Sequence, residues 1–320
     1  MITKPLIILS LVYNLVFFNL SAGKIDQRLA DFYTKEDYSA AKAENQTTII
    51  PTLRSQPTIN SASPKSYANA RQYLLVDFET GDILAANNSS KHVPIASTTK
   101  IMTAVAALEN YNLDDVVTIS TEATTQPGAD SYLRMGEKIS VLELLYCMLV
   151  KSGNDSAYAI ALFMDKSGNN DSKPFVEKMN QKAKELNMND TEYHDSAGLD
   201  TSGYSSAEDL ATITRYALLN PIFRQIVATP EYVATNIDKT IFHQLTNSNR
   251  LVNEYHYPGA IGVKTGYMPE AGHCLVGAAE RDDHTLIAVV LSTYVDSATA
   301  SVDEAKKLLD WGFTNVVWPS

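Results

Sequence analysis

The sequence has few of the features that mark nucleic-acid-binding, metal-dependent or disulfide-stabilised proteins. Its formal net charge is -11 and no run of basic residues occurs, so a clustered positive surface for nucleic acid is excluded. The 6 histidines lack metal-ligand spacing such as H-E-x-x-H, which disfavours a zinc peptidase, and we expect no metal or other cofactor. The 2 cysteines, Cys147 and Cys274, lie in apolar segments. We expect buried thiols rather than a disulfide, because a chain of this size does not need one.

The first 22 residues have the pattern of an export signal. Lys4 precedes an apolar run from Pro5 to Leu20, and the small residues Ser21 and Ala22 favour cleavage after Ala22. An uncleaved membrane anchor is the alternative. No cysteine lies near the cleavage site, so a lipid anchor is not expected there. The sequence therefore predicts a protein exported to the outer side of the cytoplasmic membrane.

The next segment, residues 23–66, is polar and contains several prolines, which predicts a linker with little fixed structure. Residues 67–320 then remain for one folded domain, which we expect to be a monomer. The chain ends soon after its last predicted helix, so membrane contact is expected only through the N-terminal segment, if that segment is uncleaved.

The hydrophobic pattern within the predicted domain places strands at both ends and helices between them. Apolar and β-branched runs predict two early strands, three late strands and a closing helix, at Gln72–Thr80, Asp82–Asn87, Gly259–Met268, His273–Glu280, Thr285–Thr293 and Ser301–Phe313. Residues 102–219 are mainly helical by the same criterion. This order predicts an α+β fold, in which one mainly antiparallel sheet is flanked by helices and an all-helical subdomain is inserted between its strands.

A serine and a lysine stand three residues apart in the stretch IASTTKIMTAVAALE. Ser97 and Lys100 begin a segment whose apolar positions recur at helical spacing, so we expect them to share one face of a helix. An amine placed there can take the proton of the hydroxyl, and the helix N-terminus favours the negative charge that develops. This pair can make a nucleophile without histidine. The alternative is that Ser97 only caps the helix.

A second candidate site lies at a corner between two apolar helices. Ser140 and Glu143 form a predicted capping box at the start of the first helix, and Ser152-Gly153-Asn154 follows its end. Gly153 suits a helix stop, and Asn154 suits a cap for the next helix. The local sequence leaves two alternatives open. Ser152 and Asn154 take part in catalysis or substrate binding, or they only cap the helices.

A third candidate site is Lys264-Thr265-Gly266, in the first of the late strands. A lysine and a hydroxyl on an edge strand can bind a carboxylate. Gly266 removes the side chain that would block a peptide backbone lying alongside. The tripeptide alone is common, so its weight comes from its combination with the other two motifs.

Together these motifs, S-T-T-K, S-G-N and K-T-G in this order, resemble those of the penicillin-recognising serine enzymes. The finer resemblance is to the D-alanyl-D-alanine carboxypeptidases of the penicillin-binding protein 5 and 6 type. It also covers stretches such as YLLVDFETGDIL, AGHCLVGAAER and LLDWGF, and so extends from about Tyr67 to Phe313. The resemblance implies a β-lactamase/transpeptidase-like fold.

The resemblance also implies a reaction and the residues that perform it. Ser97 would attack the carbonyl between the two terminal D-alanines of a peptidoglycan stem peptide, with Lys100 as the base. Ser152 would relay a proton to the leaving amine, and Asn154 would hold the substrate amide and orient Lys100. The partners implied are stem peptides and β-lactams, which would acylate the same serine.

The remaining implied residues bind the substrate. Lys264 and Thr265 would bind its terminal carboxylate, with Gly266 leaving room for the peptide. The backbone N–H groups of Ser97 and Tyr267 would form the oxyanion hole.

The sequence departs from this family at several positions. Relatives usually carry an arginine after the last strand that grips the carboxylate, whereas this chain has Ser301 near that place and no arginine after Arg281. Arg250 is the best substitute, and a purely structural role for it is the alternative. Histidines that are usual in two loops are replaced by Ala197 and Gly203, and we assign these positions no catalytic role.

Two other functions fit part of the pattern. A class A β-lactamase shares the motifs but needs a Glu-x-x-Leu-Asn element for deacylation, and the nearest match, Leu186-Asn187, has Ala183 at the glutamate position. Rapid nitrocefin turnover without a stable adduct would favour that enzyme. The missing arginine favours a non-catalytic protein that binds wall peptides or β-lactams. Against it, the serine and its candidate base are both intact.

Overall fold

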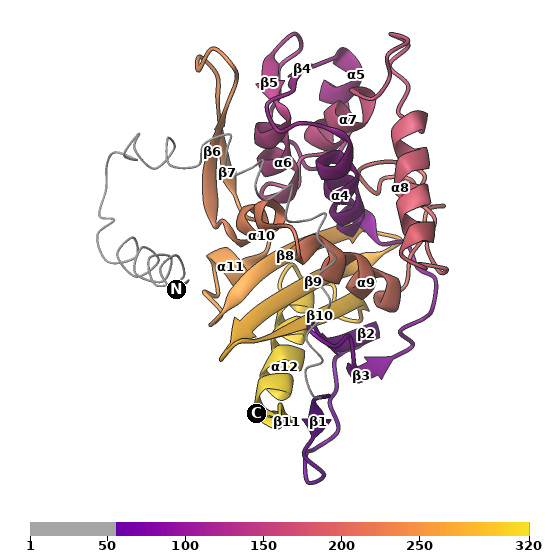
Figure 1. The fold of residues 1–320 in the computed structure, drawn as a ribbon, viewed down its shortest axis with the longest axis vertical. Helices are drawn as coiled ribbons and strands as arrows, with labels where there is room; N and C mark the ends of the chain where they lie inside the picture. Colours follow the sequence, from indigo (N-terminus) through magenta and orange to yellow (C-terminus); the bar gives the residue numbers. More distant parts are fainter. Residues whose placement is uncertain (1–55, 320) are drawn as a thin grey trace, which may run out of the picture. The chain divides into compact units, whose positions relative to one another are not determined.

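One antiparallel sheet of five strands is built from both ends of the chain (Figure 1). The computed structural model describes residues 56–319. The sheet has the order β3-β2-β10-β9-β8, from β2 (Ala70–Asp77), β3 (Ile83–Asn87), β8 (Ala260–Met268), β9 (Gly272–Arg281) and β10 (His284–Thr293). The predicted strands and the predicted α+β class are confirmed. The strand β8 lies at one edge, which leaves its outer side free of a partner strand within this sheet.

Both faces of the sheet are covered. Alternate residues of β10, from Leu286 to Val290, pack in a buried cluster with the closing helix α12 (Ala300–Asn315). A Cβ at Gly312 would lie 2.5 Å from a methyl carbon of Leu286, so glycine lets this helix approach the sheet closely. The intervening residues of β10 are also buried, on the face against which α9 (Ala207–Leu218) packs.

In the inserted part, α6 packs between other elements, as its apolar sequence predicts, and α4 and α7 are its main helical neighbours there. Seven of its 9 residues are buried. The inserted elements are η1 (Ala96–Thr99), α4 (Lys100–Asn110), β4 (Val116–Thr118), α5 (Thr121–Thr124), β5 (Lys138–Ser140), α6 (Val141–Leu149), α7 (Asn154–Leu162) and α8 (Lys173–Glu185). The predicted capping box is half formed. Ser140 Oγ accepts a hydrogen bond from the Glu143 backbone, but the Glu143 carboxylate bonds to Tyr232 and Thr235 instead.

Several elements between α9 and β8 were not predicted. They are α10 (Pro221–Ala228), β6 (Glu231–Thr235), β7 (Phe242–Thr246) and α11 (Arg250–Asn253). The strands β6 and β7 form a hairpin, and His243 on β7 is 5% exposed. Its Nε2 lies 2.9 Å from Glu137 Oε1 and its Nδ1 lies 3.0 Å from the Ser131 carbonyl oxygen. This buried hydrogen-bonded pair anchors the hairpin through polar side chains, so the sequence does not show the apolar alternation of a strand.

Regular structure begins earlier in the sequence than predicted. Thr58 and Ile59 form β1, which pairs with β11 (Val316–Val317), inside the segment predicted as a linker. Trp318, which directly follows β11, donates a hydrogen bond from Nε1 to Asp77 Oδ2 at 2.7 Å and so attaches the C-terminal segment to β2. The predicted export signal lies outside the described residues, as does most of the predicted linker.

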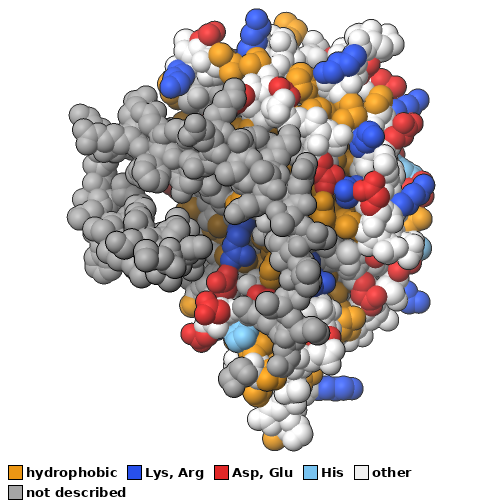
Figure 2. All heavy atoms as spheres, in the orientation of Figure 1, with side chains coloured by type: hydrophobic (Ala, Val, Ile, Leu, Met, Phe, Trp, Pro, Cys, Tyr) orange, Lys and Arg blue, Asp and Glu red, His pale blue; other side chains and the backbone are white. Residues whose placement is uncertain are grey.

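The predicted state of the two cysteines is confirmed. Cys147 and Cys274 are both buried free thiols, and burial raises the pKa of Cys274 to about 11. Within residues 56–319, no helix has the length and apolar character needed to cross a membrane. On the face shown in Figure 2, acidic and basic side chains of the described residues are interspersed among apolar ones.

Candidate active site

Ser97 and Lys100 lie together, as their spacing predicts. Ser97 is in the 3₁₀ turn η1, which leads directly into α4, and Lys100 Nζ lies 2.7 Å from Ser97 Oγ. The predicted α-helical start is thus a tighter turn, in which residues three apart stand almost in register. Neither η1 nor α4 has a side-chain cap. The capping alternative for Ser97 is therefore wrong.

Lys100 is a fully buried amine with three oxygen neighbours. Besides Ser97 Oγ, its Nζ donates to Asn154 Oδ1 at 2.7 Å and to the Ala197 carbonyl oxygen at 2.9 Å. Burial lowers the pKa of Lys100 to about 7, against an opposing effect of Asp195 and Asp155, which raise it. A substantial fraction of this amine is neutral at neutral pH, as a general base requires.

Asn154 does not cap the following helix. The N-cap of α7 is Gly153, without a side-chain hydrogen bond, so capping as the reason for Asn154 is wrong. Its carboxamide bridges two parts of the site instead, since Oδ1 accepts from Lys100 and Nδ2 donates to the Pro127 carbonyl oxygen at 2.6 Å. Both ends of the amide are engaged, which fixes its orientation.

Lys264 joins the edge strand to the corner between α6 and α7. Its Nζ donates to Ser152 Oγ at 2.8 Å and to the Thr265 carbonyl oxygen at 3.1 Å. The amine is fully buried, and burial together with the nearby Lys100 holds the pKa of Lys264 well below its usual range. Residues more than a hundred positions apart in sequence thus meet at one place.

The rest of the third motif lies along β8. Thr265 Oγ1 donates to Ser248 Oγ at 3.0 Å, and Tyr267 is 55% exposed. A Cβ at Gly266 would lie 3.0 Å from the Ser97 nitrogen and from the Ile95 carbonyl oxygen. Glycine therefore favours the close approach of β8 to the Ser97 turn, a reason that the sequence alone did not provide.

A loop that carries no predicted catalytic residue completes the contacts of Lys100. Gly198 has φ +79, and a Cβ there would lie 2.0 Å from the Ala96 carbonyl oxygen and 2.6 Å from Thr99 Oγ1. Glycine thus allows the loop to pack on the Ser97 turn and to place the Ala197 carbonyl at Lys100. This contribution was missed, because a backbone carbonyl has no signature in the sequence.

Two residues at the corners of the site have left-handed backbone conformations. Ala96, immediately before Ser97, has φ 47, and Ser152 has φ 70. Such a conformation costs a non-glycine residue about 1 to 2 kcal/mol and persists only where the surroundings enforce it. The fold therefore stores strain next to Ser97 and at Ser152.

Asp155 supports the corner from behind. Its Oδ2 accepts from the backbone N–H groups of Ser131 and Leu133, both at 3.1 Å, and so holds the segment that reaches Asn154 through Pro127. Burial, with a smaller effect of Asp130, raises the pKa of Asp155 to about 6. Sequence reasoning missed this residue, although it directly follows the S-G-N motif.

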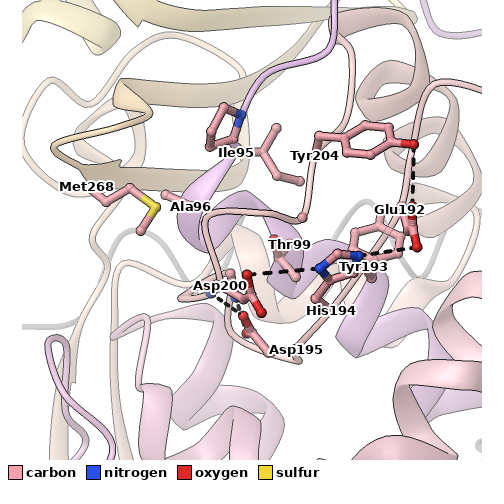
Figure 3. A pocket seen from close by; sticks show the side chains of 13 residues that line it. Ile95, Ala96, Thr99, Glu192, Tyr193, His194, Asp195, Asp200, Tyr204 and Met268 are labelled. Atoms are coloured by element: carbon pink, nitrogen blue, oxygen red, sulfur yellow. Dashed lines mark hydrogen bonds and ion pairs between the residues drawn. The ribbon is translucent and has the colours of Figure 1, made fainter.

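A small hollow beside the Ser97 turn is drawn in Figure 3. Ala96 and Thr99 contribute one wall, Met268 at the end of β8 another, and the segment around His194 a third. His194 Nε2 lies 3.2 Å from Glu192 Oε1, which ties that segment together. The hollow is next to the nucleophile candidate and does not include Lys264 among its lining residues.

The predicted substitute for the missing arginine is engaged elsewhere. Arg250 Nη1 lies 3.2 Å from Glu254 Oε2, one helical turn away, which favours the structural alternative. Ser301 is buried within α12. Among the described residues, no group of three histidine, cysteine, aspartate or glutamate side chains could hold a metal ion.

Comparison with known proteins gives consistent matches over the described fold. A family model described as D-alanyl-D-alanine carboxypeptidase matches residues 58–294. DacF of Bacillus subtilis, a D-alanyl-D-alanine carboxypeptidase, is 35% identical over 252 residues, covering 77% of this chain and 62% of that protein. A D-alanyl-D-alanine carboxypeptidase of Streptomyces sp. strain K15 is 37% identical over 250 residues, covering 73% of this chain and 84% of that protein. This chain thus spans less than two thirds of the length of DacF.

The solved structures give the same result. The crystal structure of the Streptomyces K15 DD-transpeptidase superimposes with a TM-score of 0.73 at 34% identity, covering 78% of this chain and 99% of that one.

Proposed function

Because the chain belongs to the D-alanyl-D-alanine carboxypeptidase family, we propose that it removes the terminal D-alanine from peptidoglycan pentapeptides through an acyl-enzyme on Ser97. The observation that carries the proposal is the 2.7 Å contact between Ser97 Oγ and the buried amine of Lys100. The chemistry proposed for this chain rests on the contacts among its own residues.

The first step in the proposed reaction is acylation. Ser97 Oγ attacks the carbonyl carbon of the penultimate D-alanine while its proton passes to the neutral amine of Lys100. The backbone N–H groups of Ser97 and Tyr267 stabilise the oxyanion that forms, and loss of such a donor costs about 3 to 4 kcal/mol in the barrier. Asn154 keeps Lys100 in place through its 2.7 Å hydrogen bond and offers its remaining amide proton to the substrate.

The second step releases D-alanine. The bond between the carbonyl carbon and the amine breaks, and Ser152 passes a proton to the departing nitrogen. The 2.8 Å contact from Lys264 supports this role, because a hydroxyl that accepts a hydrogen bond from an amine can give up its own proton more easily. Water then attacks the ester and gives one proton to Ser152, while Lys100 returns its proton to Ser97 Oγ, which leaves a tetrapeptide and the starting enzyme. Penicillin would acylate the same oxygen.

The alternatives receive less support. Ala183, at the position where a class A β-lactamase would need its glutamate, is 2% exposed within α8 and carries no group that could activate water. A binding protein without activity would have no use for a buried base directed at a serine hydroxyl.

The proposal extends to where the protein acts. Its family acts on the cell wall, and the apolar segment before Ala22 supports export to the wall side of the cytoplasmic membrane. The substrates and ligands proposed are stem peptides and β-lactams.

The acylation rate should depend on pH through Lys100. The pKa of this amine is lowered from 10.5 to about 7, and the amine can act as a base only after it has lost its proton. We therefore expect kcat/KM to rise about tenfold for each pH unit below about 7 and to level off above it. Stopped-flow acylation by a chromogenic β-lactam between pH 5 and 9 measures this profile. A rate that does not change between pH 6 and 8 would contradict the assignment of Lys100 as the base.

The function itself is tested with a pentapeptide-bearing muropeptide. We expect release of free D-alanine and conversion to the tetrapeptide, detected by mass spectrometry. Binding without release would support the receptor alternative. Adding an amine acceptor to the reaction distinguishes hydrolysis from acyl transfer. Incorporation of the acceptor into the product would show transfer, the activity named for the Streptomyces K15 DD-transpeptidase.

A further inference from the structure

Ser248 places a second hydroxyl next to Thr265, outside the three motifs. Thr265 Oγ1 lies 3.0 Å from Ser248 Oγ, and both side chains are half-buried. Within residues 56–319, neither of these two hydroxyls makes another hydrogen bond. Thr265 donates this bond and Ser248 accepts it, so the pair uses one of its two protons and keeps the other, on Ser248, for a ligand.

The backbone holds Ser248 in a fixed position. Its N–H donates to the Val150 carbonyl oxygen at 2.8 Å, at the end of α6 and two residues before Ser152. The flanking residues Asn247 and Asn249 are 2% and 0% exposed. Asn247 Nδ2 donates to the Thr229 carbonyl oxygen at 2.8 Å, and the Asn249 side chain caps α11. Of these three residues, Ser248 is the one whose side chain is left to face Thr265.

One buried amine lies next to this hydroxyl pair. Lys264 precedes Thr265 on β8 and binds the Thr265 carbonyl oxygen at 3.1 Å. Arg250, two residues after Ser248, is paired with Glu254 at 3.2 Å. An anion beside Thr265 therefore meets one buried amine and two hydroxyls, and an ionised acceptor strengthens each hydrogen bond that it receives.

We propose that Ser248 is a positioning residue for the terminal carboxylate of the substrate. It holds the Thr265 hydroxyl in place and leaves the pair with an O–H directed at the carboxylate, so that the site favours peptides with a free C-terminus. This inference rests on the proposed function, since the carboxylate is that of the peptide to be cleaved.

The test compares two substrates that differ only at the C-terminus. One peptide ends in D-Ala-D-Ala with a free carboxylate and the other in the corresponding carboxamide, and cleavage of both is followed by mass spectrometry. For Ser248→Ala we expect KM for the carboxylate peptide to rise about tenfold, because a hydrogen bond to a charged group is lost. We expect kcat and both constants for the carboxamide peptide to stay within about twofold. Ser248→Thr keeps the hydroxyl and should restore discrimination.

A serine elsewhere provides the matched control. Ser167 Oγ bonds to Asp165 in an exposed loop, and Ser167→Ala should leave all constants unchanged. Equal losses on both peptides, or unchanged discrimination in Ser248→Ala while the parent is active, would overturn the role of Ser248 and leave the proposed function intact. If the parent cleaves neither peptide, the proposed function fails and the inference fails with it. Melting temperatures identify any variant that is misfolded.

Discussion

Ser97→Ala is expected to abolish covalent labelling by fluorescent penicillin and to reduce D-alanine release by a factor on the order of 10⁵ or more. The reason is that the variant has no oxygen to form the acyl-enzyme, whereas every other residue of the proposed site remains. Gel fluorescence after incubation with the labelled penicillin measures the first effect, and mass spectrometry of muropeptides measures the second. The fold should persist, because Ser97 loses only its hydrogen bond with Lys100, worth about 1 kcal/mol.

A helix-capping serine is the matched control for this variant. Ser120 caps α5 by accepting from the Ala123 backbone N–H, and no lysine contact is found for its hydroxyl within the described residues. Ser120→Ala should therefore label like the parent. If Ser97→Ala is labelled as strongly as the parent, the nucleophile is a different residue and the proposed mechanism is wrong.

Lys100→Met is expected to slow acylation by about 10³-fold or more while keeping a folded protein. Methionine is similar in length to lysine and is tolerated in buried positions, but it cannot accept the serine proton. The variant leaves Asn154 Oδ1 and the Ala197 carbonyl oxygen without the amine that they bind, at a cost of about 1 to 3 kcal/mol each. The measurement is the second-order rate constant for acylation, with a melting curve alongside.

A variant of an exposed lysine serves as the control, because it removes a positive charge without removing the proposed base. Lys178 on α8 bonds to Gln181 at the surface, so Lys178→Met should acylate at the parental rate. The residual rate of Lys100→Met should also lose the inflection near pH 7. Acylation within tenfold of the parent, or an unchanged inflection, would show that another group removes the proton.

The side chains to which we assign the chemistry could be picked out from the sequence. Ser97 with Lys100, Ser152 with Asn154, and Lys264 form short patterns. The structure places them in two sets of contacts, one joining Lys100 to Ser97 and Asn154 and one joining Lys264 to Ser152. The alternating strands and the strongly apolar α6 likewise gave the architecture of the sheet and its helical insertion. These signals are local, so one sequence suffices to read them.

What could not be predicted depends on tertiary contacts. The Ala197 and Pro127 carbonyls contact Lys100 and Asn154 through the backbone, which any residue type could provide. For Asn154 the local sequence left capping open, because asparagine is common at that position, and the tertiary contact with Lys100 decides against it. The hairpin of β6 and β7 was missed because its buried His243 reads as a polar surface position.

The surroundings of Lys100 also determine the path that a proton can take. Asn154 Oδ1 and the Ala197 carbonyl oxygen can only accept hydrogen bonds, so they always face two of the nitrogen's hydrogens. When the amine is neutral, its lone pair is left pointing in the one remaining direction, toward Ser97 Oγ. The same direction is open for returning the proton to that oxygen when the ester is hydrolysed. A single amine held by two acceptors can thus serve both halves of a catalytic cycle without rotating.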